Sequence, residues 1–398
     1  SNRLEGILSG KISLSDVLGK LHGSFAGKVQ TFRLDNDSIG ELSLTAEYLP
    51  KKGLIGFTAL SRNKDFDLLA KGQYILPDSG REEMLDLTLN STHTKIDWLH
   101  QYLSDVFTNV TGYAQGVFRI TGPPKNLRYL GKVNLLDGQV RVGYTQVTYR
   151  IPKAEFEFLD DRIDLGTFTL QDTLGNSGTL TRGILRHRSF RNMNFDFALQ
   201  TPKLLAYHTT DQTKDAYYGK IIAKASVTLT GPLDDLTMNI KAQPADTSQF
   251  FIRSQNSRQS GKADYIVWKT YGKELSAPFE ARAGKLTLNM DLTANPLVQT
   301  NVIFDELTND VMSAVGHGNL KIRATTSGEF EITGQVDIEK GNYNFTFQSL
   351  LRKPFKLTGE SGSYLRWNGN PYNADMKVTA EYKSDNVKFS DLGDQLYL

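Results

Sequence analysis

The chain has 398 residues, and 46 basic against 44 acidic residues give it a formal net charge of only +2. A nucleic-acid-binding surface concentrates positive charge on one face or stripe, and this even mixture excludes one, so we expect no nucleic acid as a partner. The absence of cysteine excludes disulfides, thiol nucleophiles and iron–sulfur sites. No apolar run approaches the roughly 20 residues of a membrane-spanning helix.

The first segment, residues 1–95, is predicted to form glycine-punctuated β-strand repeats. The second segment, 96–214, continues these repeats after a short helix near residues 97–108, where apolar residues recur at three- and four-residue intervals. Asp97 is placed to cap that helix. Further short helices are predicted at Leu14–Leu21, Pro202–His208 and Asp305–Ala314.

A short phrase ending in Thr-Gly, with or without a following proline, recurs along the chain. It closes the segments Gly116–Pro123 and Ala225–Pro232, and its first half returns at Glu329–Gly334. Glycine accepts positive φ and proline donates no ladder hydrogen bond, so each copy is predicted to end a strand and open a turn. The recurrence indicates a repeat architecture.

The last segment, 215–398, contains the clearest alternation of apolar and polar residues. Successive side chains of a strand point to opposite faces, so a period of two gives each strand one apolar and one polar side. The residues predicted to share the apolar side, and to line a groove there, are Leu286, Leu288, Met290, Leu292, Leu320, Ile322, Phe330, Ile332, Val336, Ile338, Tyr343, Phe345, Phe347, Met376 and Val378.

Residues that carry chemistry are scattered. The six histidines stand singly, without the spacing of a metal site. The sequence has no nucleophile elbow, no phosphate-binding loop and no dinucleotide fingerprint. Carboxylate pairs such as Asp160-Asp161 fall in predicted turns, where aspartate is favoured for local hydrogen bonding. We therefore expect no enzyme, no catalytic residue, no cofactor and no metal.

The C-terminal half resembles a known family. From Gly328 to Phe345 a glycine-bounded hairpin leads into Gly-Asn-Tyr-Asn-Phe, which is similar to the repeat of the TamB C-terminal domain. The stretch from Phe355 to Pro371, followed by Ala-Glu-Tyr382, resembles the same family. The resemblance is fullest over residues 215–385. The helix around Trp98 is similar to an AsmA-like element of the same superfamily.

The resemblance implies an all-β fold: an elongated, repeat-like, twisted sheet folded into an open trough, often called a β-taco, with a few short helices. It implies a periplasmic protein of a Gram-negative bacterium whose full-length form is anchored in the inner membrane, this piece being soluble. The implied partners are phospholipids and an Omp85-class outer-membrane barrel, TamA-like or BamA-like. The implied function is to shield acyl chains in a hydrophobic groove for phospholipid transport between the two membranes, linked to outer-membrane biogenesis.

Elementary energetics are compatible with such a groove. Exposing acyl chain to water costs roughly 0.8 kcal/mol per CH2, or about 12 kcal/mol for a sixteen-carbon chain, and an apolar wall would remove most of that cost. Other readings remain open. The apolar face can pack against a second sheet as an ordinary core. The chain can also be a β-strand scaffold for outer-membrane protein assembly or secretion, without lipid conduction. An extracellular solenoid adhesin would require a more regular spacing than this sequence has.

Overall fold

The computed structural model describes residues 4–16, 18, 21–34, 37–78, 80–104, 107–188, 191–211, 217–253, 269–270, 273–274, 285–305, 308–347, 351–359, 362–371 and 373–383. Nearly all of this part of the chain is β-strand, so the predicted all-β class is confirmed. Helical structure within it is limited to a 3-10 turn, η1 (Asp97–Leu99), and one α-helical turn, α1 (His100–Leu103).

The strands before Leu205 are long and mostly joined by tight turns. They are β1 (Leu4–Ser15), β2 (His22–Leu34), β3 (Asp37–Leu49), β4 (Leu54–Arg62), β5 (Phe66–Ile75), β6 (Met84–Lys95), β7 (Phe107–Gly122), β8 (Arg128–Val142), β9 (Thr148–Phe158), β10 (Arg162–Asp164), β11 (Phe168–Asp172), β12 (Ser177–Arg188) and β13 (Arg191–Thr209), which runs on past this point.

The later strands differ widely in length, from two residues to eighteen. They are β14 (Tyr217–Pro232), β15 (Asp235–Pro244), β16 (Gln249–Arg253), β17 (Lys269–Thr270), β18 (Lys273–Glu274), β19 (Lys285–Ala294), β20 (Gln299–Asp305), β21 (Asp310–Thr325), β22 (Phe330–Phe347), β23 (Leu351–Thr358), β24 (Tyr364–Gly369), β25 (Ala374–Lys377) and β26 (Thr379–Glu381).

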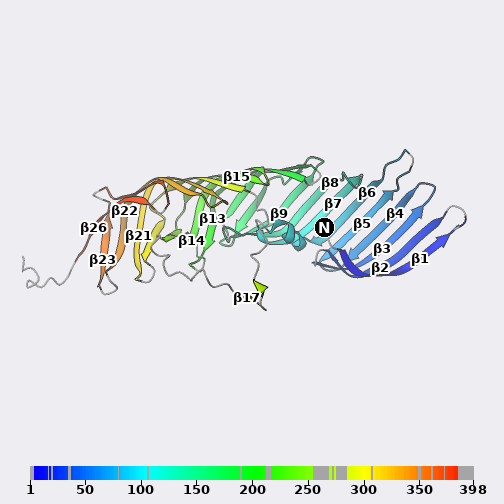
Figure 1. Cartoon of the computed structure of the whole chain (residues 1–398), viewed down its shortest axis with the longest axis horizontal. Coiled ribbons are helices and arrows are strands. Elements are labelled where there is room, and N and C mark those ends of the chain that lie inside the picture. The colour runs from blue at the N-terminus through cyan, green and yellow to red at the C-terminus, as the bar shows by residue number, and fades with distance from the viewer. Residues whose placement is uncertain are drawn as a thin grey trace, which may run out of the picture. The chain divides into compact units, whose positions relative to one another are not determined.

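The chain forms two compact units. The first comprises Ser1–Leu205, Ala225–Met238 and Gly284–Leu286, and the second comprises Ala206–Lys224, Asn239–Ala283 and Thr287–Leu398. In the first unit β1 to β9 pair antiparallel in chain order, each strand with the next, as the consecutive arrows of Figure 1 show. Consecutive hairpins of this kind build a single layer of sheet.

In the second unit the long strands have two partners on one edge. Strand β21 pairs with β20 along its first half and with β19 along its second half. Strand β22 likewise pairs with β23 and with β24. Strands β16 and β20 are parallel, unlike the other pairs just described. Each pair of short partners leaves a break in the ladder beside an uninterrupted long strand.

Strand β14 likewise has two partners, β15 and β16. Buried serine side chains bridge this break and the one between β23 and β24. The Ser248 hydroxyl, between β15 and β16, accepts from Ile222 N at 2.9 Å and donates to Ile222 O at 3.0 Å. The Ser363 hydroxyl, between β23 and β24, donates to Thr358 O at 2.8 Å and accepts from Thr379 N at 3.0 Å. Both serines are fully buried. Because an unpaired backbone group is costly inside a protein, these hydroxyls allow the sheet to break without orphaned amides or carbonyls.

The predicted helices are mostly strand. The helix near 97–108 stops after Leu103, because the chain turns back to pair Phe107 with Val142 of β8. Asp97 does not cap it; its carboxylate lies 3.1 Å from the Lys95 ammonium. Leu14 and Ser15 are the last two residues of β1, and residues 17, 19 and 20 of that predicted helix lie outside the described part. Pro202–His208 lies inside β13. Of the predicted helix Asp305–Ala314, Asp305 ends β20 and residues 310–314 belong to β21, while residues 306 and 307 lie outside the described part.

The helical spacing at 202–208 has a physical explanation. Leu204 and Leu205 are adjacent in sequence and both are buried, so this part of β13 is apolar on both sides. Burial on both faces removes the two-residue alternation, and a short run of this kind cannot be distinguished from a helical stripe by pattern alone.

The Thr-Gly phrase acts as predicted at two of its three positions. Gly122 is the last residue of β7, and Gly231 is the penultimate residue of β14; both have positive φ, at 122° and 113°. Gly334 also has positive φ, 124°, but it lies within β22, where it faces Leu320 of β21. The phrase therefore marks the same backbone conformation each time but ends a strand only where the chain then turns.

Candidate functional site

One face of the sheet formed by β1 to β8 is apolar from strand to strand. Residues directly opposite each other on paired strands point to the same face. One cross-strand row runs Ile12, Phe25, Ala46, Phe57, Gly72, Leu87, Ile120 and Tyr129. A neighbouring row runs Leu14, Gly23, Tyr48, Ile55, Tyr74, Leu85 and Gly122. The alternation of each strand is thus kept in register across the whole sheet.

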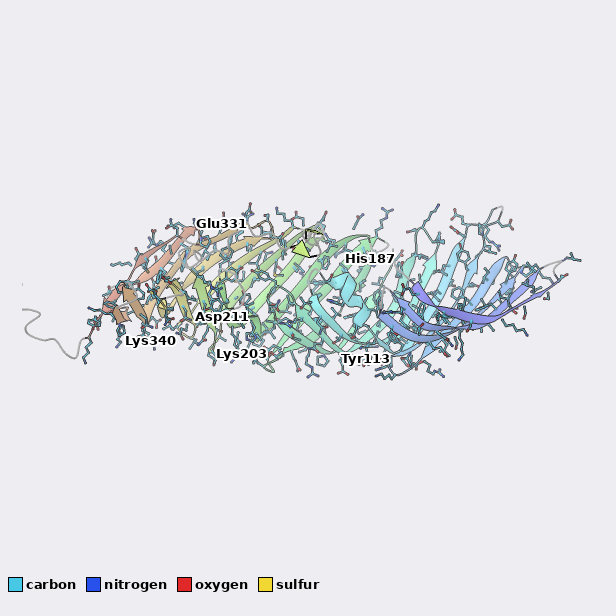
Figure 2. The ribbon with its side chains drawn as sticks, turned by 60° about the horizontal axis from the view of Figure 1, so that its bottom comes forward. Tyr113, His187, Lys203, Asp211, Glu331 and Lys340 are labelled. Carbon is cyan, nitrogen blue, oxygen red and sulfur yellow. The ribbon has the colours of Figure 1, made fainter. Side chains whose placement is uncertain are left out.

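The opposite face of these strands is largely polar. One of its rows runs Ser13, Ser24, Glu47, Gly56, Gln73, Asp86, Thr121 and Arg128. The Arg119 guanidinium pairs with the Asp86 carboxylate at 2.8 Å, and this pairing lowers the pKa of Asp86. Tyr113 of β7, labelled in Figure 2, stacks on His93 with ring centroids 3.9 Å apart.

The apolar face is not covered by a second layer. Between Leu4 and Lys95, Phe66 is the one buried apolar side chain among the side chains that the structure describes. Ile12 and Leu8 are 69% and 58% exposed. We call the following set the open apolar face: Leu8, Ile12, Leu14, Phe25, Val29, Leu42, Leu44, Tyr48, Ile55, Phe57, Leu68, Tyr74, Leu85, Leu87 and Leu89.

Further along the first unit the apolar side becomes covered. Leu135, Ile151, Ala154, Leu170 and Leu204 form a buried cluster, and Ile96, just before η1, packs against it. The cluster is bordered by a polar network. The Asp172 carboxylate accepts from Leu205 N at 2.7 Å and from Leu174 N at 2.8 Å, and the Tyr149 hydroxyl donates to Leu205 O at 2.9 Å.

Burial and hydrogen bonding act on these two groups differently. Burial alone would raise the pKa of Asp172, but hydrogen bonds from the Asn176 side chain and from backbone amides outweigh it, and the pKa is lowered. Burial, aided by the nearby Asp172 charge, raises the pKa of Tyr149. The carboxylate is therefore an ionised backbone cap, and the phenol stays protonated.

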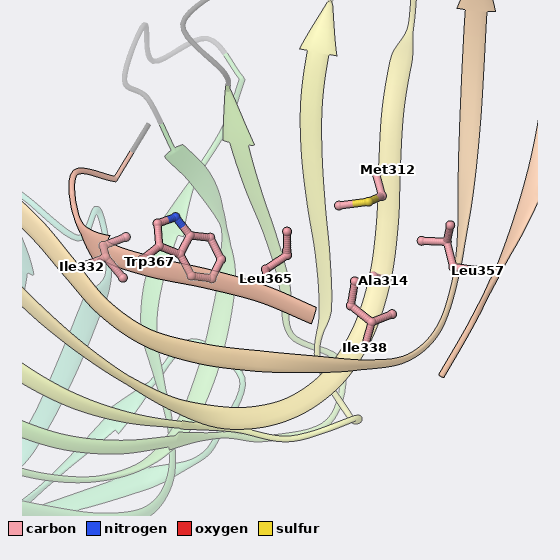
Figure 3. Close-up of a cluster of buried hydrophobic side chains, with 7 residues drawn as sticks. All are labelled: Met312, Ala314, Ile332, Ile338, Leu357, Leu365 and Trp367. Atoms are coloured by element: carbon pink, nitrogen blue, oxygen red, sulfur yellow. The ribbon is translucent and has the colours of Figure 1, made fainter. Parts of the chain in front are cut away.

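The second unit contains a closed apolar cluster, which we call the C-terminal cluster. It consists of Met312, Ala314, Ile332, Ile338, Leu357, Leu365 and Trp367. Figure 3 shows these side chains on the inner side of strongly bent strands. Leu357 is wholly inaccessible to solvent, and the Trp367 indole donates to Pro371 O at 3.2 Å. Side chains of the unit itself fill this concave region.

A β-bulge keeps β22 apolar on one side. Val315 is paired with Lys340, and its neighbour Gly316 with Ile338, so Glu339 is an extra residue. Apolar residues stand at even positions before the bulge and at odd positions after it. The bulge shifts the alternation by one, so both sets face the same side. The charged neighbours Glu331 and Lys340 are exposed, and Figure 2 labels both.

The predicted lining residues lie mostly in or around the C-terminal cluster. Ile332 and Ile338 belong to it, and Leu320, Ile322, Phe330, Val336, Tyr343 and Val378 pack against it. Leu286, Leu288, Met290, Leu292 and Phe345 are half-buried, and Met376 is exposed. The side chain of Phe347 lies outside the described part. Whether any of these residues contacts a lipid stays a prediction.

The open apolar face was not among the predicted lining residues. Its signal was present in the sequence as Leu42-Leu44-Ala46-Tyr48 and Leu85-Leu87-Leu89. Alternation shows that a strand has an apolar side, but it does not show whether that side is covered. Coverage is decided by the partners of each strand, which local sequence does not contain.

Two polar groups of the second unit, Asp310 and Tyr343, have shifted pKa values because they are partly buried. Burial raises the pKa of Asp310, and burial together with Asp310 raises the pKa of Tyr343 to about 12, so the phenol is a hydrogen-bonding group at neutral pH. The described residues include no group of three or more histidine, aspartate or glutamate side chains placed to hold a metal ion. No helix among them is both long and apolar enough to cross a membrane.

Long twisted strands with one apolar and one polar side define an all-β protein that presents an extended surface. The family model of the TamB C-terminal domain matches residues 166–395, more than half of the chain, and the chain belongs to this family. It is a family of transport and assembly modules rather than enzymes, and it acts in outer-membrane biogenesis. The family is periplasmic and membrane-linked, and it associates with Omp85-type partners such as TamA. No curated protein and no solved structure matches the chain.

Proposed function

We propose that this chain shields the acyl chains of phospholipids on its open apolar face, as part of phospholipid transport between the inner and outer membranes. One observation carries the proposal: the apolar side of β1 to β6 continues from strand to strand, with Leu8, Ile12 and Leu14 exposed and its other members half-buried. Uncovered apolar area of this extent is costly in water, and soluble proteins expose large contiguous patches mainly where they bind something apolar. The face lies upstream of residues 166–395, so it adds to what the family match supplies.

A transported phospholipid has an apolar part and a charged part, and the sheet suits both. The apolar side would replace water around the acyl chains, removing a cost of roughly 0.8 kcal/mol per CH2. The polar opposite side, with ion pairs such as Lys28–Glu41 at 2.7 Å, keeps the same strands hydrated. In this proposal an Omp85-class barrel receives the lipid at the outer membrane, and the full-length protein is anchored in the inner membrane.

The test compares two matched double variants of the full chain. Leu8→Asp/Ile12→Asp places two carboxylates on the open apolar face. Ile7→Asp/Val117→Asp places two on the opposite face, where Ile7 and Val117 are 64% and 51% exposed. All four positions are exposed, so neither variant should unfold the sheet. Native mass spectrometry and lipid extraction would report bound phospholipid.

We expect phospholipid with the unmodified chain and with Ile7→Asp/Val117→Asp, and a loss of most of it with Leu8→Asp/Ile12→Asp. Equal lipid content in both variants would contradict the proposal. So would an unmodified chain that neither carries phospholipid nor extracts it from liposomes.

A further inference from the structure

We propose that the phosphate of the bound phospholipid is recognised along one edge of the open apolar face, by cations in successive strand turns. We call this set the cationic edge; it consists of Lys51, Lys52, Arg81 and Lys125. The inference rests on the proposed function, since it assigns the headgroup of the same lipid whose acyl chains the face would cover.

Topology places these residues together. Strands β3 to β8 are consecutive and antiparallel, so every second turn lies at the same edge of the sheet. The turns between β3 and β4, between β5 and β6, and between β7 and β8 therefore follow one another along that edge. The four cations lie in these turns, and all four are exposed.

The first two of these turns are joined by a cation. The Arg81 guanidinium donates to Lys52 O at 2.8 Å and to Gly53 O at 3.3 Å. This fixes Arg81 on the turn that carries Lys51 and Lys52, so three positive charges share one small region. The second turn also carries three carboxylates, those of Asp78, Glu82 and Glu83. Asp78 and Arg81 exchange two backbone hydrogen bonds, at 3.0 and 2.9 Å, and Glu83 accepts from the Tyr74 hydroxyl at 2.6 Å. The turn that carries Lys51 and Lys52 contains no carboxylate of its own.

At the opposite edge Lys64 is an exposed cation in the turn between β4 and β5, but two further cations are ion-paired. The Arg62 guanidinium lies 3.7 Å from the Asp67 carboxylate, and the Lys95 ammonium lies 3.1 Å from Asp97. Their charge is offset locally, which leaves less to attract a phosphate. The two edges of one apolar face therefore differ, and the cationic edge is the one suited to a phosphodiester.

Tyrosines mark the same edge. Tyr48 and Tyr74 lie in the apolar row next to the cationic edge, and Tyr129 begins the adjoining row on β8. The row towards the other edge contains Leu8, Val29, Ser61 and Leu68 and no tyrosine. Tyrosine has an apolar ring and a polar hydroxyl, and it concentrates where hydrocarbon meets the headgroup region. The acyl chains would extend from this edge across the strands.

The experiment measures the affinity of the full chain for two ligands with identical acyl chains, fluorescent phosphatidylglycerol and fluorescent diacylglycerol, the second lacking the phosphate. The test variant is Lys51→Glu/Lys52→Glu. The control is Lys11→Glu/Lys71→Glu, which makes the same change of net charge in one polar row of the opposite face. Inorganic phosphate is added as competitor in a third arm.

We expect the unmodified chain to prefer phosphatidylglycerol, and Lys51→Glu/Lys52→Glu to weaken that affinity about tenfold while leaving diacylglycerol binding unchanged. The control should change neither affinity, and millimolar inorganic phosphate should compete only weakly. Equal binding of both ligands, or the same loss in both variants, would overturn the headgroup assignment while leaving acyl-chain shielding intact. Binding of neither ligand would overturn both proposals.

Discussion

The open apolar face and the C-terminal cluster are built from the same two-residue alternation and differ in what covers it. In the open apolar face, Phe57 and Leu87 have cross-strand neighbours but no second layer above them. In the C-terminal cluster, Leu357 and Met312 are almost completely buried. Apolar alternation is therefore necessary for a core but does not by itself produce one.

Strand connectivity accounts for the difference. Strands β1 to β6 are of similar length and each pairs with its neighbour in order, so the sheet remains a single layer. Strand β22 instead has a bulge at Glu339 and two short partners, β23 and β24. The bend carries Leu357 and Trp367 onto the inner side of the strands, as Figure 3 shows, and closes the apolar space with the unit's own side chains.

Of the changes considered, deletion of Glu339 should have the largest effect on stability. Without the extra residue, Tyr343 and Phe345 would move to the polar side of β22, and we expect the second unit to lose more than about 4 kcal/mol of stability. Denaturant unfolding followed by tryptophan fluorescence would measure it, with Trp98 and Trp268 replaced by phenylalanine so that Trp367 alone reports. The control Glu339→Ala keeps the bulge and should cost less than about 1 kcal/mol. Equal effects would show that the bulge does not set the register.

Replacing one side chain in the closed region should cost less than the deletion but more than any change on the open apolar face. Leu357→Ala removes a fully buried side chain and should lower the free energy of unfolding by about 3 kcal/mol. Hydrogen exchange of β22 and β23 amides would localise the loss to this region. A change below about 1 kcal/mol would mean that the cluster is not a packed core.

Replacing Asp172, which lies beside the buried cluster of the first unit, should lower the stability of that unit. Asp172→Asn replaces a carboxylate that accepts from three backbone N–H groups by an amide, whose NH2 group cannot accept from them. The free energy of unfolding should fall by about 2 kcal/mol. Because the folded-state pKa of Asp172 is lowered, its contribution is present above the unfolded-state pKa of about 4 and is lost as pH falls through the lowered value. Urea titrations at several acidic pH values would detect this. An unchanged acid dependence in Asp172→Asn would contradict the assignment.

The smallest effect is expected on the open apolar face. Ile12→Ala removes an apolar side chain that remains 69% exposed, so stability should change by no more than about 0.5 kcal/mol. Lipid binding is the property that this variant should weaken. If Ile12→Ala were as costly as Leu357→Ala in lipid-free protein, the face would be covered and the contrast between the two regions would fail.

The sequence by itself determined the β class and the apolar side of most strands. Alternation at Leu286-Leu288-Met290-Leu292 predicted a strand because side-chain direction in a strand depends only on position along the chain. Glycine at Gly122 and Gly231 predicted positive φ because few other residues tolerate it. The family resemblance over the C-terminal half was likewise carried by local motifs, and the family match includes it.

Only the tertiary structure decided which apolar sides are covered. The helical stripe at Pro202–His208 became strand because Leu204 and Leu205 are buried on opposite sides of β13. In β22 the apolar residues shift from even to odd positions because of the bulge. Whether Leu357 or Leu87 is buried depends on strands that are distant in the sequence. Side-chain direction is a local property of the backbone, whereas coverage is a property of non-local pairing. That is why the open apolar face could be seen only once the strands were paired.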